Sequence, residues 1–182
     1  ILLKWTREDE HAWEPYGTAM VCELRASLNK DGQVIEWSHE SYGDTHMGRP
    51  TPGRSGSAAE KLVSTHLQLQ SLPWPVMPPA MGPHIGIHRN LEPLYNFPNP
   101  RLVKHLVRGL PLRVSALRTL GAFANVCAIE SFVDELAEVA NISPIDFRVN
   151  HLSDGRAIEV IDLLDKKMKK ATAGNKHHLG IG

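Results

Sequence analysis

The stretch MVCELRASL (residues 20–28) is followed by NKDG (29–32) and then by QVIEWSHESY (33–42). In the first run apolar side chains alternate with mainly polar ones, which is the period of a strand with one buried face. In the second run, Ile35, Trp37 and His39 share one face. The Asn, Asp and Gly between the runs favour a tight turn. These residues predict an antiparallel β-hairpin, and residues 1–5 are a candidate neighbouring strand.

The C-terminal third of the chain has a helical period instead. Apolar residues from position 129 to 140 recur every three or four residues, which predicts a helix with one buried stripe. The tetrapeptide SPID (143–146) supplies an N-cap residue, a first-turn proline and an acidic residue, so a second helix should begin there. A third helix is predicted at 156–170. Strands that precede helices predict an α+β fold.

The middle of the chain, residues 44–111, is rich in proline and glycine. Nine of the thirteen prolines fall between positions 73 and 111, yet the same stretch carries many apolar side chains. A long ordered loop packed on other structure is therefore favoured over a flexible linker. We expect a short helix at 58–69 and short strands at 102–107 and 112–117. Residues 1–182 are expected to form one domain, or a fragment of one: strands in 1–43, loops in 44–111, and a strand, a turn and helices in 112–171.

The composition excludes several classes of protein. Twenty Lys and Arg residues balance twenty Asp and Glu residues, so no basic excess points to nucleic acid. Two cysteines are too few for a disulfide framework or a four-thiolate cluster within this chain. No apolar run reaches the 18 residues or more of a membrane span. We expect a soluble protein, with the choice between cytoplasm and periplasm left open.

Three patterns could carry chemistry. His84 and His88 lie four residues apart, but Gly86 between them argues against the helix that would align both rings, so ordinary loop histidines are favoured and no metal site is expected. GRSGS (53–57) is compatible with an anion-binding nest, although a simple turn is favoured. A row of acidic residues at helical spacing is interpreted as a solvated helix face rather than an acid–base site. The row comprises Glu130, Asp134 and Glu138.

A set of segments resembles the large subunit of the molybdenum hydroxylases. The segments are SALRTLGA (115–122), IESFVDELA (129–137), SPIDFR (143–148) and NHL (150–152), with WTREDE (5–10) and WEPY (13–16) upstream. The branch it is most similar to is the isoquinoline 1-oxidoreductase β-subunit type, related to aldehyde oxidase and xanthine dehydrogenase. The resemblance covers essentially the whole chain.

The chain also departs from the family pattern. TLGAFAN (119–125) stands where the family often has a glycine-rich stretch, and Ser143 replaces the usual acidic residue. The family's catalytic glutamate, in a G-x-G-E-type context, and its Gly-Gly-Phe-Gly-type cofactor segment have no counterpart here. We therefore expect an internal fragment of a molybdopterin-binding domain, without a catalytic residue of its own.

The resemblance implies a full-length oxidoreductase that hydroxylates a carbon beside nitrogen in an aromatic heterocycle, or an aldehyde carbon. It also implies a molybdopterin cofactor, in its cytosine dinucleotide form, and an iron–sulfur small subunit as partner. Within this chain, Ala116, Leu117 and Arg118 match the cofactor-binding segment. The isolated chain is expected to hold no cofactor and to be inactive. Its apolar Pro-rich loop is expected either to be buried by self-association or to be unusually mobile.

A second interpretation, from a different class, is a self-contained, non-enzymatic binding or scaffold domain that docks a partner with its Pro-rich loop. For Arg118 there is also an alternative: it pairs with Glu130, Asp134 or another helix carboxylate and contributes nothing to a cofactor. Gene context separates the two classes. A reading frame that continues beyond both ends, beside a cysteine-rich small subunit, favours the enzyme, whereas a stop codon just after Gly182 favours the scaffold.

Overall fold

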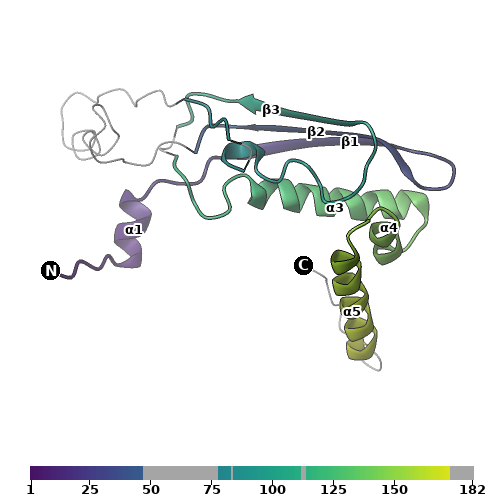
Figure 1. The fold of residues 1–182 in the computed structure, drawn as a ribbon. Coiled ribbons are helices and arrows are strands. Elements are labelled where there is room, and N and C mark those ends of the chain that lie inside the picture. The colour runs from purple at the N-terminus through teal and green to yellow at the C-terminus, as the bar shows by residue number, and fades with distance from the viewer. Residues whose placement is uncertain (47–77, 83, 112–113, 173–182) are drawn as a thin grey trace. The chain divides into compact units, whose positions relative to one another are not determined.

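The computed structural model describes residues 1–46, 78–82, 84–111 and 114–172 (Figure 1). The elements, in chain order, are α1 (Arg7–Trp13), β1 (Met20–Leu28), β2 (Val34–Gly43), the 3-10 turn η1 (Gly86–His88), β3 (Pro100–Leu106), α3 (Ala122–Ala140), α4 (Pro144–Asn150) and α5 (Gly155–Thr172). Apart from α1, strands precede helices, and the fold is α+β as predicted. The expected helix at 58–69 and the GRSGS motif at 53–57 lie outside the described residues.

The predicted hairpin of β1 and β2 is confirmed, and its turn is organised by Asn29. The Asn29 N–H donates to the Gln33 carbonyl at 2.9 Å, while the Asn29 side-chain oxygen accepts from the N–H groups of Asp31 and Gln33, both at 2.9 Å. Gly32 closes the turn with φ 76°. A Cβ at this position would lie 2.8 Å from the Ile142 side chain. The turn therefore requires glycine for its backbone angle, and a Cβ would in addition displace the end of the Ile142 side chain.

The third strand lies beside β2, which gives the sheet order β1-β2-β3 (Figure 1). At one end, the Asn99 side chain donates to the Ile35 carbonyl at 3.2 Å. At the other end, the Val107 N–H donates to the Gly43 carbonyl at 2.8 Å. Both chains advance in the same direction between these contacts, so β3 runs parallel to β2. Parallel neighbours need a long crossover, and residues 44–99 supply it.

Two of the predicted strands are wrong. Residues 1–5 are exposed and form no strand; instead α1 begins after the N-cap Thr6. The Thr6 hydroxyl accepts from the Asp9 N–H at 3.3 Å, and the Asp9 carboxylate accepts from the Thr6 N–H at 3.1 Å. This capping box was the overlooked signal for a helix. Of the described residues in 112–117, Val114 pairs with Tyr16 in an isolated parallel bridge rather than a strand.

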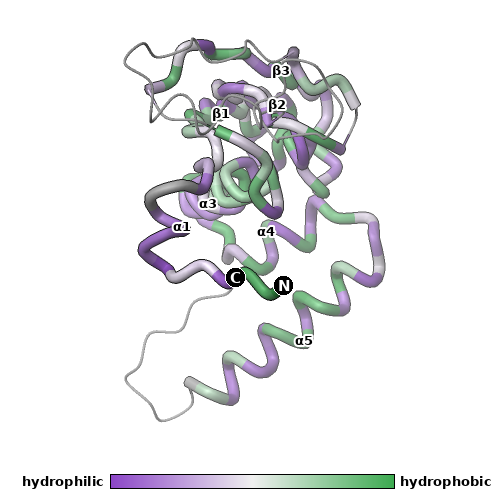
Figure 2. Tube along the Cα trace, turned by 90° about the vertical axis from the view of Figure 1, so that its left-hand side faces the viewer, coloured by the Kyte–Doolittle hydropathy of each residue, from purple (hydrophilic) through white to green (hydrophobic). Residues whose placement is uncertain are grey.

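The C-terminal helices follow the predictions closely. The Ser143 hydroxyl accepts from the Asp146 N–H at 3.1 Å, so the N-cap of α4 is confirmed. Helix α5 occupies the predicted region and contacts α4. Figure 2 shows hydrophilic and hydrophobic residues alternating along α5. Helix α3 begins several residues before the apolar stripe that predicted it. None of the described helices combines the length and apolar character that a membrane crossing requires.

The chain divides into two compact units. Unit 1 comprises Ile1–Glu23, Glu40–Leu91 and Leu102–Val126, and unit 2 comprises Leu24–His39, Glu92–Arg101 and Cys127–Gly182. Unit 1 contains η1, the first residues of α3 and the predicted cofactor segment. Unit 2 contains an aromatic core and the helices α4 and α5.

The apolar side chains of the Pro-rich segment are only partly buried by the chain itself. Within its described part, Ile87 and Leu91 are buried in unit 1, and Phe97 is buried in unit 2. Met81 and Leu94 are exposed, at 77% and 84% respectively. The segment is thus ordered and packed where these three buried residues lie, as expected of a structural loop rather than a linker.

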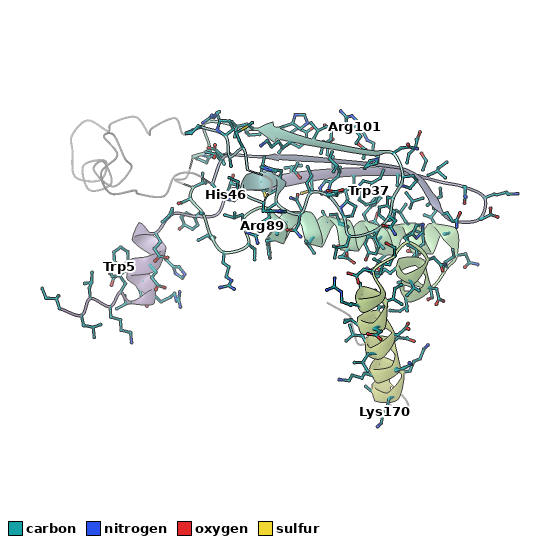
Figure 3. All side chains as sticks on the ribbon, viewed as in Figure 1. Trp5, Trp37, His46, Arg89, Arg101 and Lys170 are labelled. Carbon is teal, nitrogen blue, oxygen red and sulfur yellow. The ribbon has the colours of Figure 1, made fainter. Side chains whose placement is uncertain are left out.

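The core of unit 2 is built around Trp37. This side chain, labelled in Figure 3, is 1% exposed. Its ring stacks on Phe97 with centroids 4.6 Å apart and meets Phe132 of α3 at 5.7 Å. The strand register differs from the prediction at one position. Ile35, expected on the buried face, is 42% exposed, and Val34 is buried in its place.

The interpretation of the acidic row as a solvated face agrees with the exposure of its side chains, 42% for Glu130 and 57% for Asp134, but both carboxylates also pair with a cation. Arg148 of α4 donates from Nε to the Glu130 carboxylate at 3.1 Å and from a terminal nitrogen to Asp134 at 2.5 Å. Tyr95 donates its hydroxyl to Glu130 at 2.9 Å. Burial, followed by the neighbouring Glu130 charge, raises the pKa of Tyr95, so the phenol keeps its proton. These carboxylates therefore join α3 to α4 and to the loop before β3 within unit 2.

Candidate functional site

The predicted cofactor segment forms an exposed turn in unit 1 that leads into α3. It is anchored before the turn by Ser115, whose N–H donates to the Tyr16 carbonyl at 2.9 Å. Ala116 is half-buried, while Leu117 and Arg118 are exposed. The three residues are thus brought together on one accessible turn, as their adjacency in the sequence requires.

The backbone is strained directly after residues 116–118, where this turn leads into α3. Thr119 has φ 79° and Leu120 has φ 54°, both in the left-handed region. A β-branched residue there is an outlier, because its Cβ crowds the backbone. Such a conformation costs of order 1–3 kcal/mol, and persists only where the surroundings hold it. Strain of this kind gathers at active sites and ligand clamps, which makes the turn a candidate site on structural grounds as well.

The turn presents a run of unpaired hydrogen-bond donors. Within the described part of the chain, the backbone N–H groups of residues 116–119 meet no acceptor, and the Arg118 guanidinium makes no hydrogen bond or ion pair. Successive free amides beside a guanidinium are donors without acceptors, which suits an anionic, oxygen-rich group. Glu130 and Asp134, the alternative partners of Arg118, are bound by Arg148.

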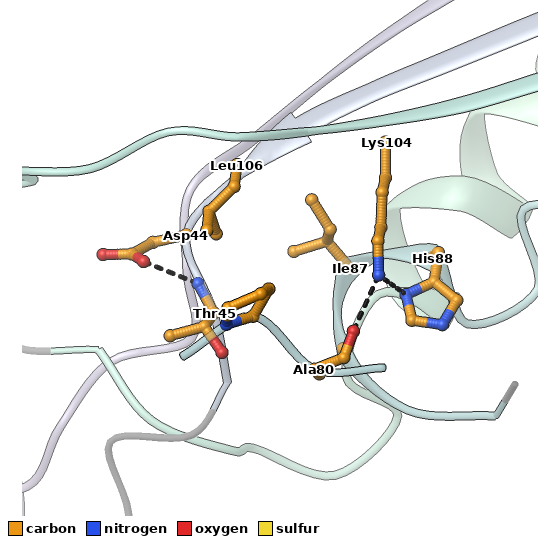
Figure 4. A pocket seen from close by; sticks show the side chains of 9 residues that line it. Asp44, Thr45, Ala80, Ile87, His88, Lys104 and Leu106 are labelled. Atoms are coloured by element: carbon orange, nitrogen blue, oxygen red, sulfur yellow. Dashed lines mark hydrogen bonds between the residues drawn. The ribbon is translucent and has the colours of Figure 1, made fainter. Parts of the chain in front are cut away.

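The hollow nearest to η1 is too small to hold a cofactor. It is lined by nine residues, among them Thr45, Ala80 and Lys104, and has a cavity volume of about 20 Å³, enough for one water molecule (Figure 4). Lys104 Nζ donates to the Ala80 carbonyl at 2.7 Å and lies 3.3 Å from His88 Nδ1. A ligand of substrate size has no place in this hollow.

The histidine pair of the sequence analysis does not converge on a common point in the structure. His84 is exposed, whereas His88 Nε2 lies 2.6 Å from the Gly82 carbonyl. Because a carbonyl only accepts, Nε2 carries the proton and Nδ1 accepts from Lys104. Across the described residues there is no group of three or more His, Cys, Asp or Glu side chains that could hold a metal ion.

Just after β2, the side chains of Thr45 and His46 are buried and find no hydrogen-bond partner among the described residues. Thr45 and His46 are 5% and 6% exposed, and neither the Thr45 hydroxyl nor either ring nitrogen of His46 has a partner of normal geometry. Burial lowers the pKa of His46 below its ordinary 6.5, against the opposing effects of the Ser115 main chain and the Asp44 carboxylate. The folded protein therefore favours the neutral imidazole.

This burial predicts an acid-sensitive stability. Below pH 6.5 the unfolded chain binds a proton at His46 that the folded chain does not, so the free energy of unfolding should fall as the pH falls from 6.5 through the lower folded pKa. Above pH 6.5 the effect is absent. Urea denaturation at several pH values between 7.5 and 4.5 would measure it.

The substitution His46→Gln should flatten this part of the pH profile, since glutamine stays neutral. His84→Gln, at an exposed position, is the matched control for the loss of one histidine and should retain the wild-type slope. Equal slopes in all three proteins would contradict a neutral buried His46.

The sequence analysis did not single out Gly121, directly before α3, or Asn125, in its first turn, which both bond to the loop at residues 86–89. Asn125 is fully buried one helical turn before Ile129 and so continues the apolar stripe with a polar residue. Asparagine has a low propensity for helix interiors. Its presence on the buried stripe of a predicted helix is the signal that could have identified Asn125. For Gly121 no comparable signal exists, because glycine at a helix start is common.

Comparison with curated proteins identifies the class to which the chain is related. The chain is homologous to a segment of molybdenum hydroxylase large subunits, in agreement with the resemblance of its motifs. A nicotinate dehydrogenase subunit of Pseudomonas putida is 32% identical over 161 residues, which cover 88% of this chain. The β-subunit of isoquinoline 1-oxidoreductase from Brevundimonas diminuta is 26% identical over an alignment of 183 positions, gaps included, which covers 97% of this chain.

The two matches cover the chain far more fully than they cover the relatives. The chain spans 12% of the length of the nicotinate dehydrogenase subunit and 20% of the isoquinoline oxidoreductase subunit. No family model matches the chain. The similarity therefore identifies the family, while the activity, substrates and partners of a whole subunit are matters for proposal.

Proposed function

We propose that this chain is a segment of the large subunit of a molybdopterin-dependent oxidoreductase, and that the turn at residues 116–118 contacts the cofactor. The observation that carries the proposal is the strained turn with its run of unpaired donors, in a chain homologous to molybdenum hydroxylase large subunits. When bound, the cofactor, in its cytosine dinucleotide form, supplies the oxidation chemistry, and the protein supplies position and electrostatics.

The substrate class proposed is an aromatic nitrogen heterocycle, hydroxylated at a ring carbon. Both relatives are named for such compounds, nicotinate and isoquinoline. The aldehyde alternative has no comparable support. An iron–sulfur small subunit is the proposed electron-accepting partner; in support, both relatives are named as subunits of larger enzymes.

The role of the turn follows from its donors. The N–H groups of residues 116–119 would donate hydrogen bonds to oxygen atoms of an anionic group, and the Arg118 guanidinium would add a positive charge. Because the backbone already holds these donors in place, little reorganisation is needed when charge develops during the reaction. No residue of this chain is proposed as the catalytic base.

The isolated chain should hold no molybdenum and catalyse no hydroxylation, because the proposed cofactor site needs further parts of a longer subunit. Elemental analysis of the purified 182-residue chain and assays with nicotinate and isoquinoline would test this expectation. A stoichiometric molybdenum content, or measurable turnover, would contradict it. Size-exclusion chromatography of the same sample would test whether it self-associates.

In the longer subunit, assembled with its partner, Arg118→Ala should lower turnover at least tenfold. A tenfold loss corresponds to about 1.4 kcal/mol of transition-state stabilisation, which is reasonable for one charge-assisted contact. Steady-state turnover per molybdenum atom is the measurement, so that cofactor loss is counted separately.

Arg156→Ala is the matched control for Arg118→Ala. Arg156 is also exposed, and pairs with Asp154 at 2.9 Å in unit 2 rather than lying on the turn. Its replacement should leave turnover within about twofold, because an exposed ion pair contributes little. Normal turnover of the Arg118 variant at full molybdenum content would refute a role for the guanidinium.

A further inference from the structure

The buried amide of Asn125 ties three parts of unit 1 together. Its nitrogen donates to the main-chain carbonyls of Ile87, at 2.8 Å, and Arg89, at 2.9 Å. Its oxygen accepts from the Ser41 hydroxyl at 2.6 Å and from the Cys22 thiol at 3.6 Å. With both donors and the acceptor engaged, the Asn125 side chain is fully satisfied, and it can occupy only one orientation.

A second contact holds the same loop against the start of α3. The Gly121 N–H donates to the Gly86 carbonyl at 3.1 Å. A Cβ on Gly121 would lie 2.4 Å from the Ile87 carbonyl oxygen and 2.6 Å from its carbon, so the approach needs glycine. These obstructing atoms are backbone, which cannot move aside as a flexible side chain can. The loop from Gly86 to Arg89 is therefore clamped to α3 at two positions, Gly121 and Asn125.

The clamp lies directly beside the strained turn. Gly121 follows Thr119 and Leu120, the two residues in the left-handed region. Two hydrogen bonds between residues three positions apart follow the same backbone. The Leu120 N–H donates to the Leu117 carbonyl at 3.1 Å, and the Ala122 N–H donates to the Thr119 carbonyl at 3.0 Å. A strained backbone relaxes unless it is held at both ends. Ser115 anchors one end, and the clamp provides the other.

We propose that Asn125 and Gly121 are positioning residues, which hold the 116–118 turn in its donor-presenting shape by clamping the Gly86–Arg89 loop to α3. The inference rests on the proposed function of the turn as a cofactor contact. Neither residue need touch the cofactor. Loss of the clamp should let the turn relax, so that the N–H groups of residues 116–119 are no longer held in the arrangement that they have in the structure.

The test uses near-isosteric and steric variants of the full chain. Asn125→Asp keeps the shape of the side chain but replaces its NH₂ group, the donor of both hydrogen bonds, by an oxygen atom. That oxygen would face the carbonyls of Ile87 and Arg89. Gly121→Ala adds the obstructed Cβ and serves as a second variant if the first does not fold. Ser41→Ala is the matched control: it removes one bond to the Asn125 oxygen and leaves both clamp bonds to the loop.

Two readouts are measured by NMR on proteins whose folding is verified by circular dichroism. One is the hydrogen-exchange rate of the Gly121 amide, which the clamp protects. The other is the shift of the amide signals of residues 116–119 on titration with molybdate, used as an oxoanion probe. In both clamp variants, exchange should be at least tenfold faster and the molybdate affinity at least tenfold lower. In Ser41→Ala both should stay within about threefold of the wild type.

The outcomes separate this inference from the proposed function. If molybdate shifts the turn amides in the wild type and shifts them equally in Asn125→Asp, the clamp does not position the turn and the inference is overturned. Exchange of the Gly121 amide at the Ser41→Ala rate in both clamp variants would overturn it as well. If molybdate shifts no turn amide even in the wild type, the exchange rate at residue 121 alone decides on the clamp, and the cofactor role of the turn is decided by the turnover of Arg118→Ala in the longer subunit.

Discussion

Replacement of Trp37 by alanine is expected to lower the free energy of unfolding by about 3–5 kcal/mol, the range for removing a buried aromatic side chain. Trp37 is 1% exposed and contacts Phe97 and Phe132 through its rings. Removing the indole would leave a cavity between strand and helix in unit 2 that these rings cannot fill. Urea denaturation followed by far-UV circular dichroism is the suitable measurement, because the substitution removes a fluorophore.

Trp37→Phe is the control that isolates packing from polarity. The Trp37 ring nitrogen is buried and has no hydrogen-bond partner in the part of the chain that the structure describes, so phenylalanine removes an unsatisfied donor as well as some volume. These effects have opposite signs, and the net change should stay within about 1 kcal/mol. A loss in Trp37→Phe as large as in the alanine variant would mean that the indole N–H has a partner and that packing is not the main contribution.

His151→Ala should cost about 3 kcal/mol, because the ring contributes both hydrogen bonds and packing. His151 is 8% exposed; its Nδ1 lies 2.7 Å from the Phe147 carbonyl and its Nε2 lies 3.1 Å from the Val34 N–H. Since a carbonyl accepts and an N–H donates, the imidazole is neutral with its proton on Nδ1. Alanine would leave the buried Val34 N–H unsatisfied, at a cost of about 1–3 kcal/mol, and would add a cavity beside Phe147.

The matched control is His84→Ala, at an exposed position, which should change the free energy of unfolding by less than about 0.5 kcal/mol. The tautomer can be read directly from the two ring nitrogen resonances of His151. Detection of the proton on Nε2, or a cost for His151→Ala no larger than that of the control, would contradict the described hydrogen bonds.

The hairpin, β3 and the helices α3, α4 and α5 could be predicted from local patterns because each depends on residues close in sequence. Alternation from position 20 to 28, the turn at Asn29 and Gly32, and the Ser143 cap are of this kind. The strand predicted at residues 1–5 was wrong because a short apolar run forms a strand only where a neighbouring strand pairs with it. The capping box of Thr6 and Asp9 was the better guide to the first element.

The exposed donor turn shows the limit of such patterns. Its position at residues 116–118 follows from motif resemblance, but the sequence carries no sign that Thr119 adopts φ 79°. That angle depends on partners 32 or more positions away, Gly86 bonded to Gly121 and Ile87 bonded to Asn125. Contacts at such separations are absent from any local window.

The acidic row is a second example of a feature that depends on a distant partner. Spacing alone places Glu130 and Asp134 on one helix face, and a solvated face is the simplest interpretation of like charges. Whether those charges meet water or a cation depends on where Arg148 of α4 lies, which helical periodicity does not contain.

Strand alternation, helix caps and turn residues are thus encoded within a few positions of one another, because backbone angles and side-chain faces are local properties. The family can also be identified from the sequence, because the order of its motifs along the chain can be compared without knowing which residues are in contact. Three features arise only when distant segments meet: the clamp at Asn125, the neutral His151, and the burial of His46 without a hydrogen-bond partner among the described residues. Burial and hydrogen-bond partners are properties of the folded chain, and tertiary packing alone assigns them.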